Sequence, residues 1–169
     1  GTIKSDGKWI EVKDADEILL LSDIKLLYEQ TSLDISMLKN KIDDINPDYD
    51  ALKNTHEKIH SELYNRFSFD LGNDTQLQLT SEELLESSKI DSFNNDLVVQ
   101  LMKAARYNTI SSSGKLPPTL QGIWGGTWWP AWSGDFTLNG NVPSAIASGL
   151  NTNFPEVTKA YLNLMTGWF

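Results

Sequence analysis

The spacing of hydrophobic and polar residues predicts a short β-rich start to the chain. Hydrophobic and polar positions alternate along residues 8–12, and a short apolar run covers residues 17–21, a pattern that is typical of strands. Gly7 marks a turn before the first of them. Because two short strands cannot bury a face alone, we expect their partner strands to be supplied by residues preceding Gly1.

After residue 22 the spacing changes toward helix. Apolar positions are loosely spaced over residues 23–45, which predicts a linker with helical turns. Asn46, Pro47 and Asp48 then have the residue types of a helix start. They supply an amide cap, a proline for the first turn and an acid near the positive end of the helix dipole.

The helix that follows carries an apolar stripe. Its members recur at helical spacing and are Leu52, His56, Ile59, Leu63 and Phe67. His56 is therefore predicted to lie in the core, whereas His60 is predicted to face solvent. The helix is predicted to end near Arg66.

Further helices are predicted along the second half of the chain. Thr80 followed by Glu83 is a capping-box sequence, and Ser92 is predicted to cap a longer helix. Helical spacing returns over residues 142–150 and again over residues 155–168. The sequence thus predicts a mainly α protein with a few strands at its start.

Composition excludes several classes of partner. The 169 residues are 40% hydrophobic and 22% charged, which is typical of a folded globular protein. A net charge of −9 argues against nucleic acid and against an anionic membrane surface. No apolar run is long enough to span a membrane, and the first ten residues lack the basic and apolar regions of a signal peptide.

The residue types also limit the available chemistry. Without cysteine and with only two histidines, the chain has carboxylates, amides and tyrosines for catalysis and cannot form disulfides or thiolate metal sites. Asp44, Asn46 and Asp48 match the first half of a calcium-binding loop. Tyr49 and Thr55, however, stand where that loop needs a glycine and a bidentate acid. We expect no metal site and no cofactor.

The segment with the most unusual composition is residues 121–141, which reads QGIWGGTWWPAWSGDFTLNGN. Four of the six tryptophans of the chain, Trp124, Trp128, Trp129 and Trp132, fall within nine residues of it. Its glycines interrupt regular structure, and loops mostly run near the surface. Exposed indoles beside polar groups suit the stacking of sugar rings. We interpret at least two of these indoles as lining a binding site, the alternative being that all of them are core residues.

Asn139 and Asn141 have two interpretations. In an extended segment, residues two apart point to the same face, so the two carboxamides would lie side by side and could hold a water or a substrate hydroxyl. Alternatively, Asn139 and Gly140 are simply a turn dipeptide. The residues by themselves leave both interpretations open.

Three segments in a fixed order carry a likeness to a known family. They are HEKIHSELYNRFSFDLG at residues 56–72, ARYNTISSSGKLPPTLQGIW at residues 105–124 and AWSGDFTLNGN at residues 131–141. Together they resemble glycoside hydrolase family 95, the α-L-fucosidases and related α-L-galactosidases. The start, GKWIEVKDADEILLLS at residues 7–22, is similar to the end of the amino-terminal β-sandwich of that family.

The resemblance implies a domain organisation. Residues 1–22 would be the last strands of an N-terminal β-sandwich domain, and residues 23–45 a linker. Residues 46–169 would be the first helices of an (α/α)6 catalytic barrel, incomplete in this chain. We therefore expect the chain to be a section of a larger enzyme, to have the rest of the same polypeptide as a partner, and to be inactive alone.

The resemblance also implies a reaction, the inverting hydrolysis of a terminal α-linked sugar. A glutamic acid outside this chain would protonate the leaving oxygen, while two asparagines, assisted by an aspartate, would hold the attacking water. By motif position these asparagines are Asn139 and Asn141, which favours the catalytic interpretation. The residues expected to bind the sugar are Gln121, Trp124, Trp128, Trp132, Asp135 and Thr137.

The expected substrate is a glycan with terminal α-linked L-fucose or a related sugar. After Asn141 the family usually continues with Gln-Met-Asn-Tyr-Trp-Pro, whereas residues 142–147 here read VPSAIA, so the resemblance favours hydrolysis more than one particular sugar. The parent protein is expected to be extracellular or periplasmic. Two other classes remain open: a non-catalytic carbohydrate-binding protein, and a structural helical repeat protein with its tryptophans in the core.

Overall fold

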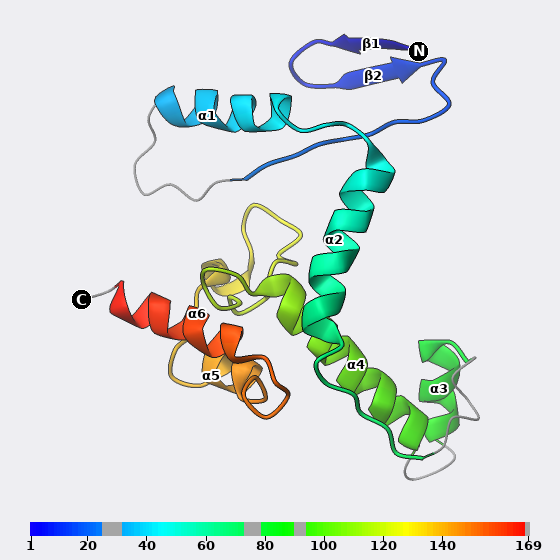
Figure 1. Ribbon diagram of the computed structural model, residues 1–169, viewed down its shortest axis with the longest axis vertical. Coiled ribbons are helices and arrows are strands. Elements are labelled where there is room, and N and C mark those ends of the chain that lie inside the picture. The colour runs from blue at the N-terminus through cyan, green and yellow to red at the C-terminus, as the bar shows by residue number, and fades with distance from the viewer. Residues whose placement is uncertain (25–31, 73–78, 90–93, 168–169) are drawn as a thin grey trace. The chain divides into compact units, whose positions relative to one another are not determined.

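The computed structural model describes residues 1–24, 32–72, 79–89 and 94–167 (Figure 1). By their internal contacts the residues form two compact units, Gly1–His56 and Glu57–Phe169. The tryptophan-rich segment and all of the predicted site residues belong to the second unit.

A small antiparallel hairpin begins the first unit. Strand β1 (Thr2–Ser5) pairs with β2 (Ile10–Lys13), and the turn is closed because Asp6 Oδ1 accepts hydrogen bonds from the backbone amides of Lys8 and Trp9, at 2.9 and 2.8 Å. Gly7 occupies the left-handed region with φ 86°, which glycine adopts without strain. The hairpin therefore forms largely from local chemistry.

The strand predicted at residues 17–21 is wrong, because this stretch has no regular secondary structure. An isolated apolar run can form a ladder only when a neighbouring strand supplies the hydrogen-bonding partners. Among the residues that the structure describes, the sheet contains β1 and β2 alone.

Two helices follow in the chain. Helix α1 (Ser32–Asp43) occupies much of the stretch predicted to be a linker with helical turns, of which residues 25–31 lie outside the described ranges. Helix α2 (Tyr49–Tyr64) begins later than predicted, because Asp48 is its cap. Asp48 Oδ1 accepts a hydrogen bond from the amide of Ala51 at 3.0 Å, so the expected cap at Asn46 is wrong by two residues.

The prediction for the two histidines of α2 is reversed in the structure. The side chain of His56 is exposed, whereas His60 is half-buried. The ring of His60 stacks on Tyr64 at 5.9 Å between centroids and contacts the ring of Tyr107 at 4.9 Å. Helical spacing gives the faces of a helix, but the position of the neighbouring α4 decides which face is covered.

Helices α3 (Ser81–Ser88) and α4 (Asn95–Ser112) pack side by side (Figure 1). The predicted capping box is confirmed, since the Thr80 amide donates to Glu83 Oε2 at 2.7 Å and the Glu83 amide donates to Thr80 Oγ1 at 3.3 Å. The predicted cap Ser92 lies outside the described residues. In the structure α4 is capped by Asn94, whose Oδ1 accepts from the Leu97 amide at 3.1 Å.

Helix α5 (Asn141–Ile146) is shorter than the helix predicted over residues 142–150, and α6 (Pro155–Thr166) begins at the predicted proline. The chain turns between them at Gly149, where an added Cβ would lie 2.5 Å from Val157 Cγ1. No side chain fits at that distance, so this turn requires glycine. One cluster of the core of the second unit contains Ile110, Ile146, Phe154 and Val157, with Leu63, Tyr64 and Tyr161 packed against it.

The prediction of a mainly α protein is confirmed. Within the described ranges the chain has six α-helices and one two-stranded sheet. Whether the helices form a section of an (α/α)6 barrel, and whether the hairpin ends a β-sandwich, stays a prediction. No helix in these ranges is both long enough and apolar enough to cross a lipid bilayer.

Part of the stability of the second unit is expected to be lost in acid, because it depends on one ion pair. Arg66 Nη1 lies 2.6 Å from Glu156 Oε1, and this hydrogen bond lowers the pKa of Glu156 below its ordinary value. A carboxylate with a lower pKa when folded stabilises the protein above its unfolded pKa of about 4.3, and loses that contribution as the pH falls through the folded value. The free energy of unfolding, measured by urea titration, should fall from about pH 5 toward pH 3.

Glu156→Gln should flatten this pH profile, modestly because the pair is partly exposed and is screened by salt. Glu62→Gln serves as the matched control, since Glu62 contacts the same arginine at the longer distance of 3.7 Å, and it should change the profile less. Equal pH profiles for the two variants would show that the Arg66–Glu156 hydrogen bond is not the source of the acid-sensitive stability.

Candidate functional site

The tryptophan-rich segment forms a closed loop after α4. The Leu120 amide donates to the Asp135 carbonyl at 2.8 Å and joins the two ends of what we call the tryptophan loop, residues 120–135, drawn in yellow in Figure 1. Just before it, Thr119 Oγ1 donates to the Gly122 carbonyl at 2.8 Å. The loop thus has a hydrogen-bonded base.

The end of the loop is a left-handed turn. Trp132, Ser133 and Gly134 have φ values of 56°, 56° and 61°, and this conformation costs energy in residues other than glycine. Short-range hydrogen bonds offset part of that cost. The Ser133 amide donates to the Pro130 carbonyl and the Asp135 amide to the Trp132 carbonyl, each at 3.1 Å.

All four indoles of the loop are exposed in the structure. Trp124 is 52% exposed, while the exposed fractions of Trp128, Trp129 and Trp132 are 96%, 90% and 77%. Burial in the core of this chain, the alternative left open by the sequence, is therefore not observed. The loop presents aromatic surface that a ligand or another protein segment can contact.

Trp124 differs from the other three indoles because its ring rests on the loop backbone. A Cβ added at Gly122 would lie 2.8 Å from Cζ3 of Trp124, so the ring occupies the space that a side chain would take. Gly122 also has a φ of 61°, which favours glycine. The Trp124 ring thus packs against the loop at Gly122.

Gln121 contacts both halves of the loop. Its side-chain Nε2 donates to the Ala131 carbonyl at 2.8 Å, and its backbone carbonyl accepts from the Trp124 amide at 3.2 Å. Its Oε1 is buried and finds no hydrogen-bond donor among the residues that the structure describes. Gln121 is predicted to bind the sugar, and in the structure its amide nitrogen contacts the loop itself.

Asp135 and Thr137 lie beside one another. Thr137 Oγ1 donates a hydrogen bond to Asp135 Oδ1, which orients the carboxylate. The backbone of Thr137 is left-handed, with φ 36°, and its carbonyl accepts from the Val142 amide at 3.3 Å. This bond turns the chain from the loop into α5.

The predicted pair of asparagines lies at this turn. Asn139 is within a turn and Asn141 is the first residue of α5, and both side chains are exposed. The expected extended geometry is therefore wrong, because the Thr137–Val142 hydrogen bond and the burial of Val142, 1% exposed, start a helix here. Both carboxamides are open to the surroundings, and their catalytic role stays a prediction.

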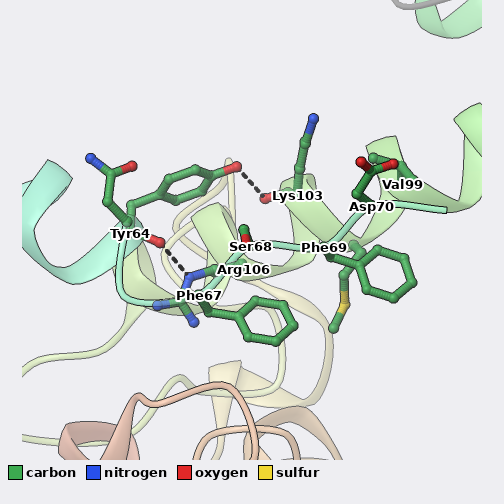
Figure 2. Close-up of a pocket in the computed structure, with 10 residues that line it drawn as sticks. Tyr64, Phe67, Ser68, Phe69, Asp70, Val99, Lys103 and Arg106 are labelled. Atoms are coloured by element: carbon green, nitrogen blue, oxygen red, sulfur yellow. Dashed lines mark hydrogen bonds between the residues drawn. The ribbon is translucent and has the colours of Figure 1, made fainter. Parts of the chain in front are cut away.

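A cavity that the sequence did not predict lies between residues 64–70 and α4 (Figure 2). Its volume is about 280 Å³. In Figure 2 the rings of Phe67 and Phe69 lie on one side of the extended segment, and the alternation of aromatic and polar residues there is the signal that could have indicated it. The lining residues are Tyr64, Asn65, Phe67, Ser68, Phe69, Asp70, Val99, Met102, Lys103 and Arg106. None of the predicted site residues lines this cavity.

Arg106 forms one wall of the cavity and connects three segments. It is 8% exposed and donates to the carbonyls of Leu63, Tyr64 and Thr152 at 2.6, 2.9 and 2.8 Å. Two of these carbonyls end α2, where the helix leaves its last acceptors unpaired and its dipole attracts a cation. Its guanidinium also lies 5.6 Å from the centroid of the Phe67 ring. Burial lowers the pKa of Arg106 below its ordinary value, yet arginine stays charged at neutral pH.

Comparison with known proteins gives a family match over most of the chain. Residues 48–169 match the Glycosyl hydrolase family 95 catalytic domain. A relative from Aspergillus niger (strain ATCC MYA-4892 / CBS 513.88 / FGSC A1513), described as "Probable alpha-fucosidase A", is 39% identical over 99 residues, which are 56% of this chain and 12% of that protein. A relative from Aspergillus oryzae (strain ATCC 42149 / RIB 40) with the same description is 36% identical over 123 residues, 68% of this chain and 16% of that protein. No solved structure matches the chain.

Proposed function

The chain belongs to glycosyl hydrolase family 95, and from this membership we propose that it forms part of an inverting exo-glycosidase that releases terminal α-linked L-fucose or a related sugar. The observation that carries the proposal is the closed loop with exposed indoles that leads directly into Asp135 and the two asparagines. The two relatives are described as probable alpha-fucosidases. Because the chain spans 12% and 16% of their lengths, the proposal concerns the whole protein that carries this sequence.

In this proposal Asn139 and Asn141 position the nucleophile. A carboxamide oxygen accepts a hydrogen bond from water and directs its lone pair, while the amide nitrogen can donate to a sugar hydroxyl. The water attacks the anomeric carbon as the glycosidic bond breaks, and its proton passes to the aspartate that assists the asparagines. A glutamic acid elsewhere in the polypeptide protonates the leaving oxygen. Inverting enzymes leave room for this water by separating the two reacting groups by about 6.5–9.5 Å.

The sugar is bound by the loop that precedes the asparagines. A pyranose presents C–H groups on one face, which stack on an indole, and hydroxyl groups at its edge, which bond to acids and amides. Trp124 is the best-supported platform, because its ring packs against Gly122. Trp128 and Trp132 would contact neighbouring sugar units, and the Asp135–Thr137 pair would accept a hydrogen bond from a sugar hydroxyl.

The proposal includes a domain assignment. Residues 1–22 would end a β-sandwich, residues 23–45 would be the linker, and residues 46–169 would supply the first helices of the barrel, with the rest of the polypeptide completing the site. The enzyme would act on extracellular or periplasmic glycans.

The proposal is tested by a turnover screen of the whole protein with aryl α-L-fucoside, α-L-galactoside and other aryl glycosides. We expect release of the aryl group from an α-L-glycoside, and ¹H NMR during early turnover should detect the β-anomer of the sugar first, as inversion requires. The 169-residue chain alone should release none. Sugar-dependent tryptophan fluorescence without hydrolysis of any substrate would instead favour the non-catalytic carbohydrate-binding protein.

A further inference from the structure

Gln121 is hydrogen-bonded to Trp124, one proposed sugar platform, and to Ala131, the residue before a second platform, Trp132. Its backbone carbonyl holds the Trp124 amide at 3.2 Å. Its side-chain nitrogen holds the carbonyl of Ala131, the residue directly before Trp132, at 2.8 Å. The neighbouring Leu120–Asp135 hydrogen bond of 2.8 Å closes the loop next to it.

We propose that Gln121 is a positioning residue, which fixes Trp124 relative to Trp132 through its contacts within the loop and does not itself bind the sugar. The proposal rests on the function proposed above. Its amide nitrogen donates to the Ala131 carbonyl and its Oε1 is buried, so the side chain is directed into the loop and its oxygen is not presented to a ligand. Trp124 and Trp132 lie on irregular backbone, with glycines on both sides that leave the chain conformationally free. A hydrogen bond across the loop reduces that freedom and keeps the two indoles in a fixed relation.

The direction of the Gln121–Ala131 hydrogen bond, with Gln121 as the donor, makes the proposal testable. A backbone carbonyl can only accept a hydrogen bond. Gln121→Glu keeps the size and shape of the side chain but places a carboxylate oxygen against that carbonyl, and the two acceptors repel each other. Gln121→Met removes the donor without adding a charge.

Gln100 provides a matched control on α4. Its Nε2 donates to Ser81 Oγ at 2.6 Å, and a serine hydroxyl can both donate and accept. After Gln100→Glu the serine can donate to the new carboxylate, so this contact survives the substitution that breaks the contact of Gln121.

The first measurement is amide hydrogen exchange of the 169-residue chain, followed by NMR at the hydrogen-bonded amides of Leu120, Trp124 and Asp135. We expect Gln121→Glu to accelerate their exchange about tenfold and Gln121→Met to accelerate it about threefold, since exchange follows the opening of local hydrogen bonds. Gln100→Glu should leave these amides unchanged, and the amides of α4 should be unchanged in both Gln121 variants. If Gln121→Glu does not fold, Gln121→Met decides the outcome.

The second measurement separates positioning from a purely structural role. In the whole protein with aryl α-L-fucoside, both Gln121 variants should raise KM about tenfold or more and change kcat by less than about threefold, because misplaced indoles weaken sugar binding without touching the attacking water. Gln100→Glu should leave both constants unchanged.

The outcomes distinguish this inference from the proposed function. Unchanged exchange in the loop of both Gln121 variants would overturn the positioning role, and so would a raised KM with unchanged exchange, which would mean a direct contact with the sugar. A wild-type protein without activity on any aryl glycoside would contradict the proposed function. The amide hydrogen exchange experiment would still report whether Gln121 orders the loop.

Discussion

Replacing Asn139 or Asn141 with alanine in the whole protein is expected to lower kcat for aryl α-L-fucoside by about 10²- to 10³-fold, the range that a group positioning a proton-bearing nucleophile contributes. KM should change by less than about threefold, because in the proposed site the indoles and the Asp135–Thr137 pair bind the sugar and would remain in place. Steady-state kinetics at saturating and limiting substrate separate the two constants.

Asn151→Ala is the control for the two asparagine variants. Asn151 is an exposed asparagine of the turn between α5 and α6, so its loss removes the same carboxamide from a place without a proposed role. It should leave kcat and KM unchanged. A rise in KM at constant kcat in Asn139→Ala and Asn141→Ala would refute the water-positioning role and assign both side chains to sugar binding.

The largest effect on stability is expected at Arg106. Arg106→Met leaves the carbonyls of Leu63, Tyr64 and Thr152 without their donor, and we expect the free energy of unfolding to fall by about 2–4 kcal/mol. Arg106→Lys should recover part of this loss, because a lysine keeps the charge near the end of α2 but cannot reach three carbonyls with one ammonium group. Urea unfolding followed by far-UV circular dichroism measures both changes.

Lys103→Met tests whether the effect belongs to the hydrogen bonds of Arg106. Lys103 lies on the same helix, and its side chain is exposed. Removing a cation from that position should change the free energy of unfolding by less than about 0.5 kcal/mol. Equal losses in Lys103→Met and Arg106→Met would show that the charge on α4, and not the contacts with the carbonyls, stabilises the fold.

The elements that the sequence predicts correctly are those determined within a few residues. The capping box of Thr80 and Glu83 forms at the predicted positions because both partners lie in one turn, and α6 begins at Pro155 for the same kind of reason. Asn46 and Asp48 are both good caps, and the choice between them depends on where the first helical hydrogen bond forms. The run at residues 17–21 fails because a strand depends on a partner that local sequence cannot supply.

The candidate site was predictable in composition but not in geometry. Clustered tryptophans among glycines indicated an exposed loop, and the structure places those indoles at the surface. The spacing of Asn139 and Asn141 suggested an extended segment, yet a left-handed Thr137 and a buried Val142 turn the chain into a helix. The contact between Gln121 and Ala131 depends on loop closure, and no local pattern reports it.

The backbone hydrogen bond between Leu120 and Asp135 joins the two ends of the intervening stretch without using a side chain. Because main-chain atoms seal its base, insertions, deletions or altered aromatics within it need not displace Asp135 or the residues downstream. If the proposed function holds, the loop could change which glycan binds while the two asparagines keep their positions. Exchanging this segment between homologues would then change sugar selectivity.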